Sequence, residues 1–160
     1  MHGQNNYLDL SLLRGKTPLD LQHNFAISQE RASGYPYDRA LSLQKYSKFS
    51  FYLYGRYTGN SILQLDHKSR LISWCIFYPL DRAQNASRKG LGTIAHVKSI
   101  LDISKYAKPD YTVEHSRATS LRDKHLEAMG LSKRERLETY IRKSIDYAAR
   151  KGFSFNNPFS

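Results

Sequence analysis

The stretch SRKGLGT, Ser87–Thr93, joins an apolar run to a segment with helical periodicity. The apolar run Ile72–Tyr78 predicts a buried strand, and the apolar residues that recur after Thr93 predict a helix. Glycines let the backbone approach a ligand closely, a helix N-terminus presents N–H groups without intrahelical partners, and Arg88 and Lys89 add positive charge. We therefore expect an anion-binding loop here, suited to a phosphate group. The alternative is that the two glycines only turn the chain.

Three short β-rich runs precede the loop and predict an antiparallel meander. They cover Ser50–Tyr54, Ser61–Leu65 and Arg70–Tyr78, and turn residues at Thr58–Asn60 and Asp66–Ser69 separate them. The third run is almost continuously apolar, which indicates a central strand that is buried on both faces.

A crossover unit is predicted after the glycine loop. Apolar residues at helical spacing favour a helix over Thr93–Tyr106, and Tyr111–His115 has the composition of a strand. A strand that returns through a helix lies parallel to the strand before it, so we expect Tyr111–His115 beside the third strand of the meander. A shorter helix that follows Ser116–Ser120 ends at Gly130.

Both ends of the chain are predicted to be helical. Thr17–Asp20 has the form of a capped helix start, which predicts a helix over Pro18–Ala32, and Pro36 begins a second helix that includes Tyr46. Ser132–Glu135 is a capping-box sequence, and it predicts a helix up to Gly152. We add an edge strand at 153–155. The single domain, 1–160, thus has N-terminal helices (1–48), a central meander and crossover (49–131), and a C-terminal helix with a tail (132–160).

Composition indicates a folded chain with anionic partners. The 160 residues are 40% hydrophobic and carry a formal charge of +11 at pH 7. The basic residues are spread along the chain, which predicts a basic surface that suits a phosphorylated cofactor, a nucleic acid or an acidic protein. No apolar run is long enough to span a membrane and the first residues do not resemble a signal peptide, so we expect a cytoplasmic protein. Cys75, the only cysteine, is expected to be a buried, inert thiol.

The predicted order of elements resembles the Gcn5-related N-acetyltransferase superfamily over residues 50–131. Two motifs carry the resemblance: Arg88–Thr93 is similar to the acyl-CoA pyrophosphate loop, and Leu126–Leu131 is similar to a helix end of that family. The resemblance implies an α+β fold, a three-layer α/β sandwich with a mixed sheet and flanking helices. It also implies transfer of an acyl group, acetyl in the simplest case, from acetyl-CoA or another acyl-CoA to an amine or hydroxyl. The acceptor stays open between a protein, a small amine and an RNA-linked amine.

The resemblance also implies roles for individual residues. Glu114 or His115, at the end of the predicted crossover strand, is a candidate general base, although either can equally be a solvated strand-end side chain. The tyrosine that is often the general acid in the family corresponds to Leu126. Acyl-CoA would contact Phe77 and Tyr78 near the thioester, and its pyrophosphate would contact Arg88, Lys89, Gly90, Leu91, Gly92 and Thr93.

The histidines do not have the spacing of metal ligands, so no metal site is predicted. His96 falls opposite the apolar face of its predicted helix, and we expect it on the surface.

Two other functions fit the sequence. The first is binding of single-stranded nucleic acid, in which Tyr52, Tyr54, Arg56 and Tyr57 would offer rings and charge on a sheet face. Aromatic strand residues that only fill a sheet face would give the same pattern. The second is binding of another protein through the basic surface, without chemistry.

Overall fold

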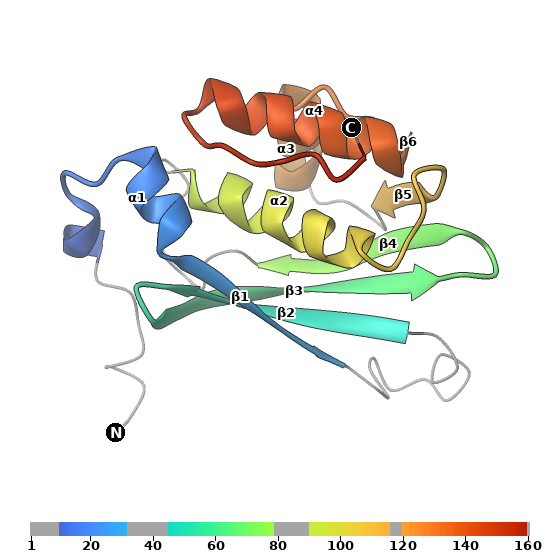
Figure 1. Cartoon of the computed structure of the whole chain (residues 1–160), viewed down its shortest axis with the longest axis horizontal. Coiled ribbons are helices and arrows are strands. Elements are labelled where there is room, and N and C mark those ends of the chain that lie inside the picture. The colour runs from blue at the N-terminus through green and yellow to red at the C-terminus, as the bar shows by residue number, and fades with distance from the viewer. Residues whose placement is uncertain (1–9, 32–44, 79–89, 116–119, 160) are drawn as a thin grey trace.

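The computed structural model of the chain describes residues 10–31, 45–78, 90–115 and 120–159. It is an α+β fold in which helices lie over a six-stranded mixed sheet (Figure 1). The strands neighbour each other in chain order: β1 (Phe25–Arg31), β2 (Lys45–Leu53), β3 (Arg56–Asp66), β4 (Leu71–Tyr78), β5 (Thr112–His115) and β6 (Arg134–Arg136). The helices are the 3-10 helix η2 (Leu10–Leu13), α1 (Pro18–His23), α2 (Leu91–Ser104), α3 (Ser120–Ala128) and α4 (Leu137–Arg150).

The antiparallel meander is confirmed, and it gains a strand at its start. Strands β1 to β4 pair antiparallel in succession. Thr58–Asn60, which we expected to separate the first two predicted strands, lies inside β3. One of these residues is the extra residue of a bulge in the pairing of β2 with β3. β4 is buried on one face only: Ile72 and Trp74 are buried, whereas Cys75 is partly exposed and not the buried thiol that we expected.

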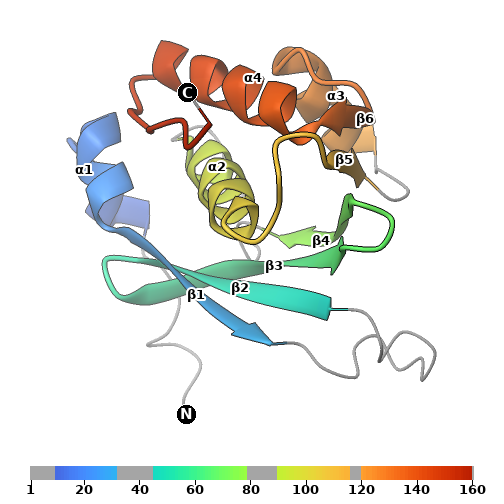
Figure 2. The ribbon, with the colours of Figure 1, turned by 45° about the vertical axis from the view of Figure 1, so that its right-hand side comes forward.

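The crossover is also confirmed, since β4 leads through α2 to β5 and the two strands pair in parallel. α2 lies between the sheet below and α4 above (Figure 2), and it is therefore buried on most of its circumference. Leu91, Ile94 and Ile100 are completely buried. His96 is buried as well, with 2% of its surface exposed. The prediction that His96 lies on the surface is wrong, because α4 covers the face of α2 that we expected to be exposed to solvent.

The prediction of a long N-terminal helix is wrong beyond the first turns of that helix. The cap is correct: the Asp20 N–H donates to Thr17 Oγ1 over 3.1 Å and the Thr17 N–H donates to Asp20 Oδ2 over 3.0 Å. The helix nevertheless ends at His23, and β1 begins at Phe25 and pairs with β2 along its whole length. Buried and exposed residues alternate here, with Phe25 buried between more exposed neighbours, and this alternation is typical of a strand. Tyr46, expected on a second helix, lies in β2, and the rest of that predicted helix falls outside the described residues.

The C-terminal helix begins later than predicted. The Glu135 carboxylate accepts the Ser132 N–H over 3.2 Å, as a capping box requires, but the residues at 134–136 form β6 and pair with β5. The helix α4 starts only at Leu137. The same local hydrogen bond therefore closes a turn before a short strand. The edge strand expected at 153–155 is absent from the described C-terminal segment, where Phe153 is instead buried against Gly90.

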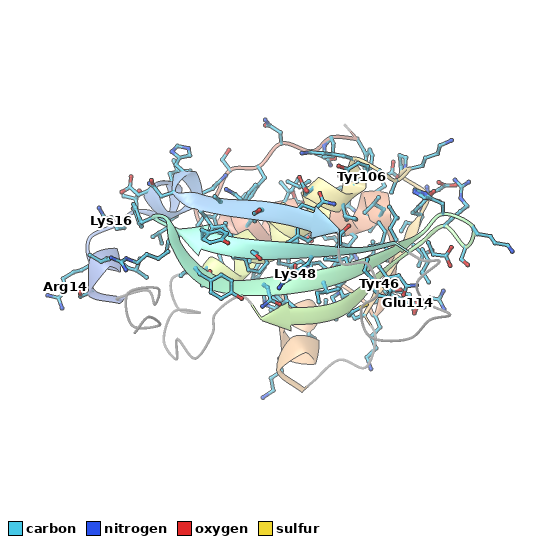
Figure 3. All side chains as sticks on the ribbon, turned by 90° about the horizontal axis from the view of Figure 1, so that it is seen from below. Arg14, Lys16, Tyr46, Lys48, Tyr106 and Glu114 are labelled. Carbon is cyan, nitrogen blue, oxygen red and sulfur yellow. The ribbon has the colours of Figure 1, made fainter. Side chains whose placement is uncertain are left out.

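Helices α1, α2 and α4 all lie on one side of the sheet, whereas the three-layer sandwich that we expected has helices on both sides. Figure 3 views the opposite face, which carries Tyr46 and Lys48 of β2 and Glu114 of β5. Among the described helices, none has the length and apolar character needed to cross a bilayer.

Candidate active site

The parallel pairing of β4 with β5 leads to the candidate site. It runs from Leu71 with Thr112 to Trp74 with His115, which is the last residue described in this part of the chain. β4 continues to Tyr78 along β3, and Cys75 is an extra residue in that ladder, because Leu63 pairs with Trp74 and Ile62 pairs with Ile76. A bulge bends its strand and increases the local twist. Cys75 therefore marks a local bend of β4 just beyond Trp74.

A small cavity lies at this point, with room for about one water molecule. Its walls come from four elements that are far apart in the sequence. The two strands, α2 and α3 contribute the lining side chains, which are Trp74, Phe77, His96, His115, His125 and Leu126. The lining is aromatic and imidazole-rich, and imidazoles are the side chains best suited to proton transfer near neutral pH.

Three histidines and one tyrosine hydroxyl form a connected cluster beside the cavity. The Tyr140 hydroxyl on α4 lies 2.5 Å from Nε2 of His96 and 2.8 Å from Nε2 of His115. On the other side of its ring, His96 Nδ1 lies 3.4 Å from Nε2 of His125, a long contact. Tyr140 is completely buried, and His96 and His115 are nearly so. A hydroxyl has one hydrogen and also accepts, so it can donate to one of the two imidazoles and accept from the other.

Ring packing fixes the positions of these imidazoles. The His115 ring stacks on Trp74 with an interplanar angle of 10° and a centroid distance of 5.7 Å. The His96 ring meets the Trp74 ring at 90°. Burial lowers the pKa of His125, and the positive charge of Lys151 lowers it further. At neutral pH His125 is therefore a neutral imidazole that can donate through one nitrogen and accept through the other.

Only the last part of the glycine loop, from Gly90 onward, lies within the described residues. Gly90 is the N-cap residue of α2, with φ +81°, and a Cβ at this position would lie 2.7 Å from the Phe153 ring. Leu91 and Thr93 are buried, whereas Gly92 is partly exposed. Any anion at this helix start would thus meet backbone N–H groups and not these two side chains. Arg88 and Lys89 lie outside the described residues, as does the side chain of Tyr78.

The structure separates the two candidate bases. His115 lines the cavity, together with Phe77. Glu114 alternates with the buried Val113 and His115 and lies on the opposite face of the sheet, the face seen in Figure 3. The sequence analysis missed His96, His125 and Tyr140. They share no sequence signal: Tyr140 falls among the apolar residues of its helix whereas His96 falls opposite them, and no spacing rule connects residues from α2, α3 and α4.

The tyrosines of the nucleic-acid alternative are divided. Tyr52 and Tyr57 pair across β2 and β3 and meet edge to face, with centroids 5.9 Å apart. Tyr54 lies in the turn with φ 52°, and the Lys16 ammonium lies over its ring at 5.3 Å. A ring face occupied by a lysine, and a pair of rings packed against each other, offer less stacking surface than four separate aromatic side chains would.

No protein-family model, curated protein or solved structure was found to match this chain. In the described ranges, no three histidine, cysteine or carboxylate side chains converge as a metal site requires. Function is therefore inferred from the cavity, its side chains and the start of α2.

Proposed function

We propose that the protein transfers an acyl group from an acyl-CoA to an amine or hydroxyl acceptor. The observation that carries the proposal is the imidazole-lined cavity at the end of the β4–β5 pairing that the structure describes. In general, backbone groups at the end of a parallel strand pair can bind an extended, amide-containing ligand. The pantetheine arm of coenzyme A is such a ligand, with two amide groups in an extended chain.

His115 is the group that we assign as general base. It pairs with Trp74 in the parallel ladder, its ring stacks on the Trp74 ring, and it borders the cavity. A neutral imidazole can accept the proton that an amine loses when it attacks a thioester carbonyl. Glu114 is removed from this role because its side chain is on the far face of the sheet.

The start of α2 supplies the second element of the proposal. Gly90 ends the loop in a left-handed conformation, and as a glycine in the N-cap position it offers the N–H groups of the first turn no capping side chain. Such N–H groups, together with the helix dipole, favour a phosphate. The same chain segment, β4 followed by the loop and α2, would then hold both the thioester end and the pyrophosphate end of acyl-CoA.

Calorimetry tests the proposal directly. We expect wild-type protein to bind acetyl-CoA or a longer acyl-CoA, and we expect the substitution Gly92→Glu to weaken that binding at least 10-fold. A carboxylate at the second position of α2 would repel the pyrophosphate, while it favours the helix itself because acidic residues stabilise helix N-termini. Gly92 suits this test better than Gly90, where any side chain would collide with Phe153.

The matched control is Ala149→Glu, which adds the same charge at an exposed position near the end of α4. Its affinity should equal that of the wild type. Absence of heat with both acetyl-CoA and a long-chain acyl-CoA, on wild-type protein that is shown to be folded, would exclude the proposed function.

A further inference from the structure

The contacts of the histidine cluster form one continuous chain of hydrogen-bonding groups. From one end to the other it reads His115, Tyr140, His96 and His125, and the distances between neighbouring groups along it are 2.8, 2.5 and 3.4 Å. Both ends, His115 and His125, line the same cavity, whereas the hydroxyl in the middle is completely buried. The chain thus leaves the cavity on the strand side and returns to it on the α3 side.

The atoms allow two neutral arrangements of protons. In the first, His115 Nε2–H donates to Tyr140, the Tyr140 hydroxyl donates to His96 Nε2, and His96 Nδ1–H donates to His125 Nε2. In the second, every donor and acceptor is exchanged. The two differ by one proton gained at Nδ1 of His115 and one lost at Nδ1 of His125. A neutral imidazole carries one N–H and one lone pair, so each ring can pass a proton without becoming charged.

We propose that this chain is a proton relay that takes the proton of the acceptor at His115 and delivers a proton to the leaving thiolate at His125. The proposal rests on the proposed acyl transfer. The acceptor nitrogen forms a bond to the thioester carbonyl carbon, the C–S bond breaks, and the sulfur leaves as a thiolate. The acceptor proton goes to Nδ1 of His115, three protons shift along the chain, and the proton on Nδ1 of His125 goes to the sulfur, which yields the free thiol of CoA.

The relay supplies a general acid from a residue that the sequence did not point to. Leu126, which corresponds to the frequent acid position of the family that the sequence resembles, lines the cavity but carries no proton. The neighbouring residue His125 does, and its contact with His96 connects it to the base. His115 and His125 are thus the catalytic residues, and Tyr140 and His96 are positioning residues that act through them. After release of product, exchange with water at the partly exposed His125 resets the relay.

Side-chain NMR of the full-length protein tests the relay without any substrate. Long-range ¹H–¹⁵N spectra report which ring nitrogen of each histidine carries the proton. We expect His96, His115 and His125 to titrate together in the wild type, with a shift at all three when any one takes up a proton. In Tyr140→Phe we expect His115 to titrate independently of the other two. Independent titration of all three histidines in the wild type would overturn the relay, even if acyl-CoA binds.

Turnover with acetyl-CoA tests the other half of the proposal. Tyr140→Phe should lower kcat about 10- to 100-fold with little change in KM, and it should alter the pH profile of kcat. His125→Gln breaks the chain at its part-exposed end and should lower kcat similarly, which keeps the test valid if Tyr140→Phe does not fold. Tyr106→Phe, at the surface position labelled in Figure 3, is the control and should retain full activity.

The outcomes distinguish the two proposals. Coupled titration with no binding of acyl-CoA would overturn the proposed function, and the role of the relay in it. Binding and turnover with kcat unchanged in both Tyr140→Phe and His125→Gln would overturn the relay and leave acyl transfer standing.

Discussion

Gly90 illustrates how one residue can satisfy both a structural and a functional demand. Its φ of +81° belongs to the left-handed region, which glycine enters at little cost, and the Phe153 ring occupies the space that a Cβ would need. Sequence reasoning assigned this glycine to close approach of a phosphate. The structure adds a second reason, since the C-terminal segment closes over the start of α2 at this atom.

We expect Gly90→Ala to destabilise the protein by about 2–4 kcal/mol, because the strain of a left-handed alanine and the clash with a buried ring add. The matched control is Gly130→Ala, with φ +74° and open space around the missing Cβ, which should cost only about 1–2 kcal/mol. Urea unfolding of both variants measures the difference. In a Phe153→Leu background, where a smaller side chain replaces the ring, Gly90→Ala should lower the free energy of unfolding by less. An unchanged loss of stability there would refute the steric explanation.

At the scale of elements, α2 is the centre of the molecule. It packs on the sheet, underlies α4 and contributes His96 to the cavity (Figure 2). It also connects to the N-terminal part of the chain through Lys98. The Lys98 ammonium donates to the main-chain carbonyls of Gln22, over 3.1 Å, and of Phe25, and it lies near the Phe25 ring. These two carbonyls flank the junction between α1 and β1, where the helix ends and the chain enters the sheet.

Lys98→Met should cost about 1–3 kcal/mol, because it keeps the apolar stem but leaves two carbonyls at the α1–β1 junction without their donor. Burial lowers the pKa of Lys98, so part of the loss is offset by removal of a desolvated charge. Lys105→Met is the control, since Lys105 is an exposed residue after the end of α2 and should change stability by less than about 0.5 kcal/mol. Equal stability of the two variants in urea would contradict the proposed role of Lys98.

At the scale of the whole molecule, the cavity makes stability depend on pH. Burial lowers the pKa of His125 below its ordinary value of about 6.5, and the positive charge of Lys151 lowers it further. Among the described residues, His96 and Tyr147 are titratable groups that contact its ring. The unfolded chain therefore binds a proton at His125 at higher pH than the folded chain does. The stabilisation is fully present above pH 6.5 and declines as the pH falls through 6.5 toward the lowered pKa of the folded state.

We expect the free energy of unfolding to decrease between pH 7.5 and pH 5.5, and we expect His125→Asn to show a smaller decrease over the same range. Urea unfolding at several pH values measures both slopes, and circular dichroism at each pH confirms that the variant is folded. Identical slopes for wild type and variant would show that His125 does not contribute.

The sequence alone predicted much of the central fold, for reasons that are local. The meander, the α2 helix and the parallel return of β5 follow from periodicity, turn residues and the handedness of crossovers. Local signals gave wrong predictions where the same capping hydrogen bonds can precede either a long helix or another structure. The cap at Thr17 opens only a short helix, and the Ser132 to Glu135 contact precedes a strand, because pairing of β1 with β2 and of β6 with β5 outweighs helix propensity.

The candidate site divides in the same way. The sequence by itself determined that a basic glycine loop leads into a helix and that a strand ends at Glu114 and His115. Only the tertiary structure decided that His115 faces the cavity while Glu114 does not, and that His96, His125 and Tyr140 join it there. The physical reason is that these contacts span 25 to 44 residues of chain. Such contacts arise from the packing of α3 and α4 against α2 and β5, and no local pattern records that packing.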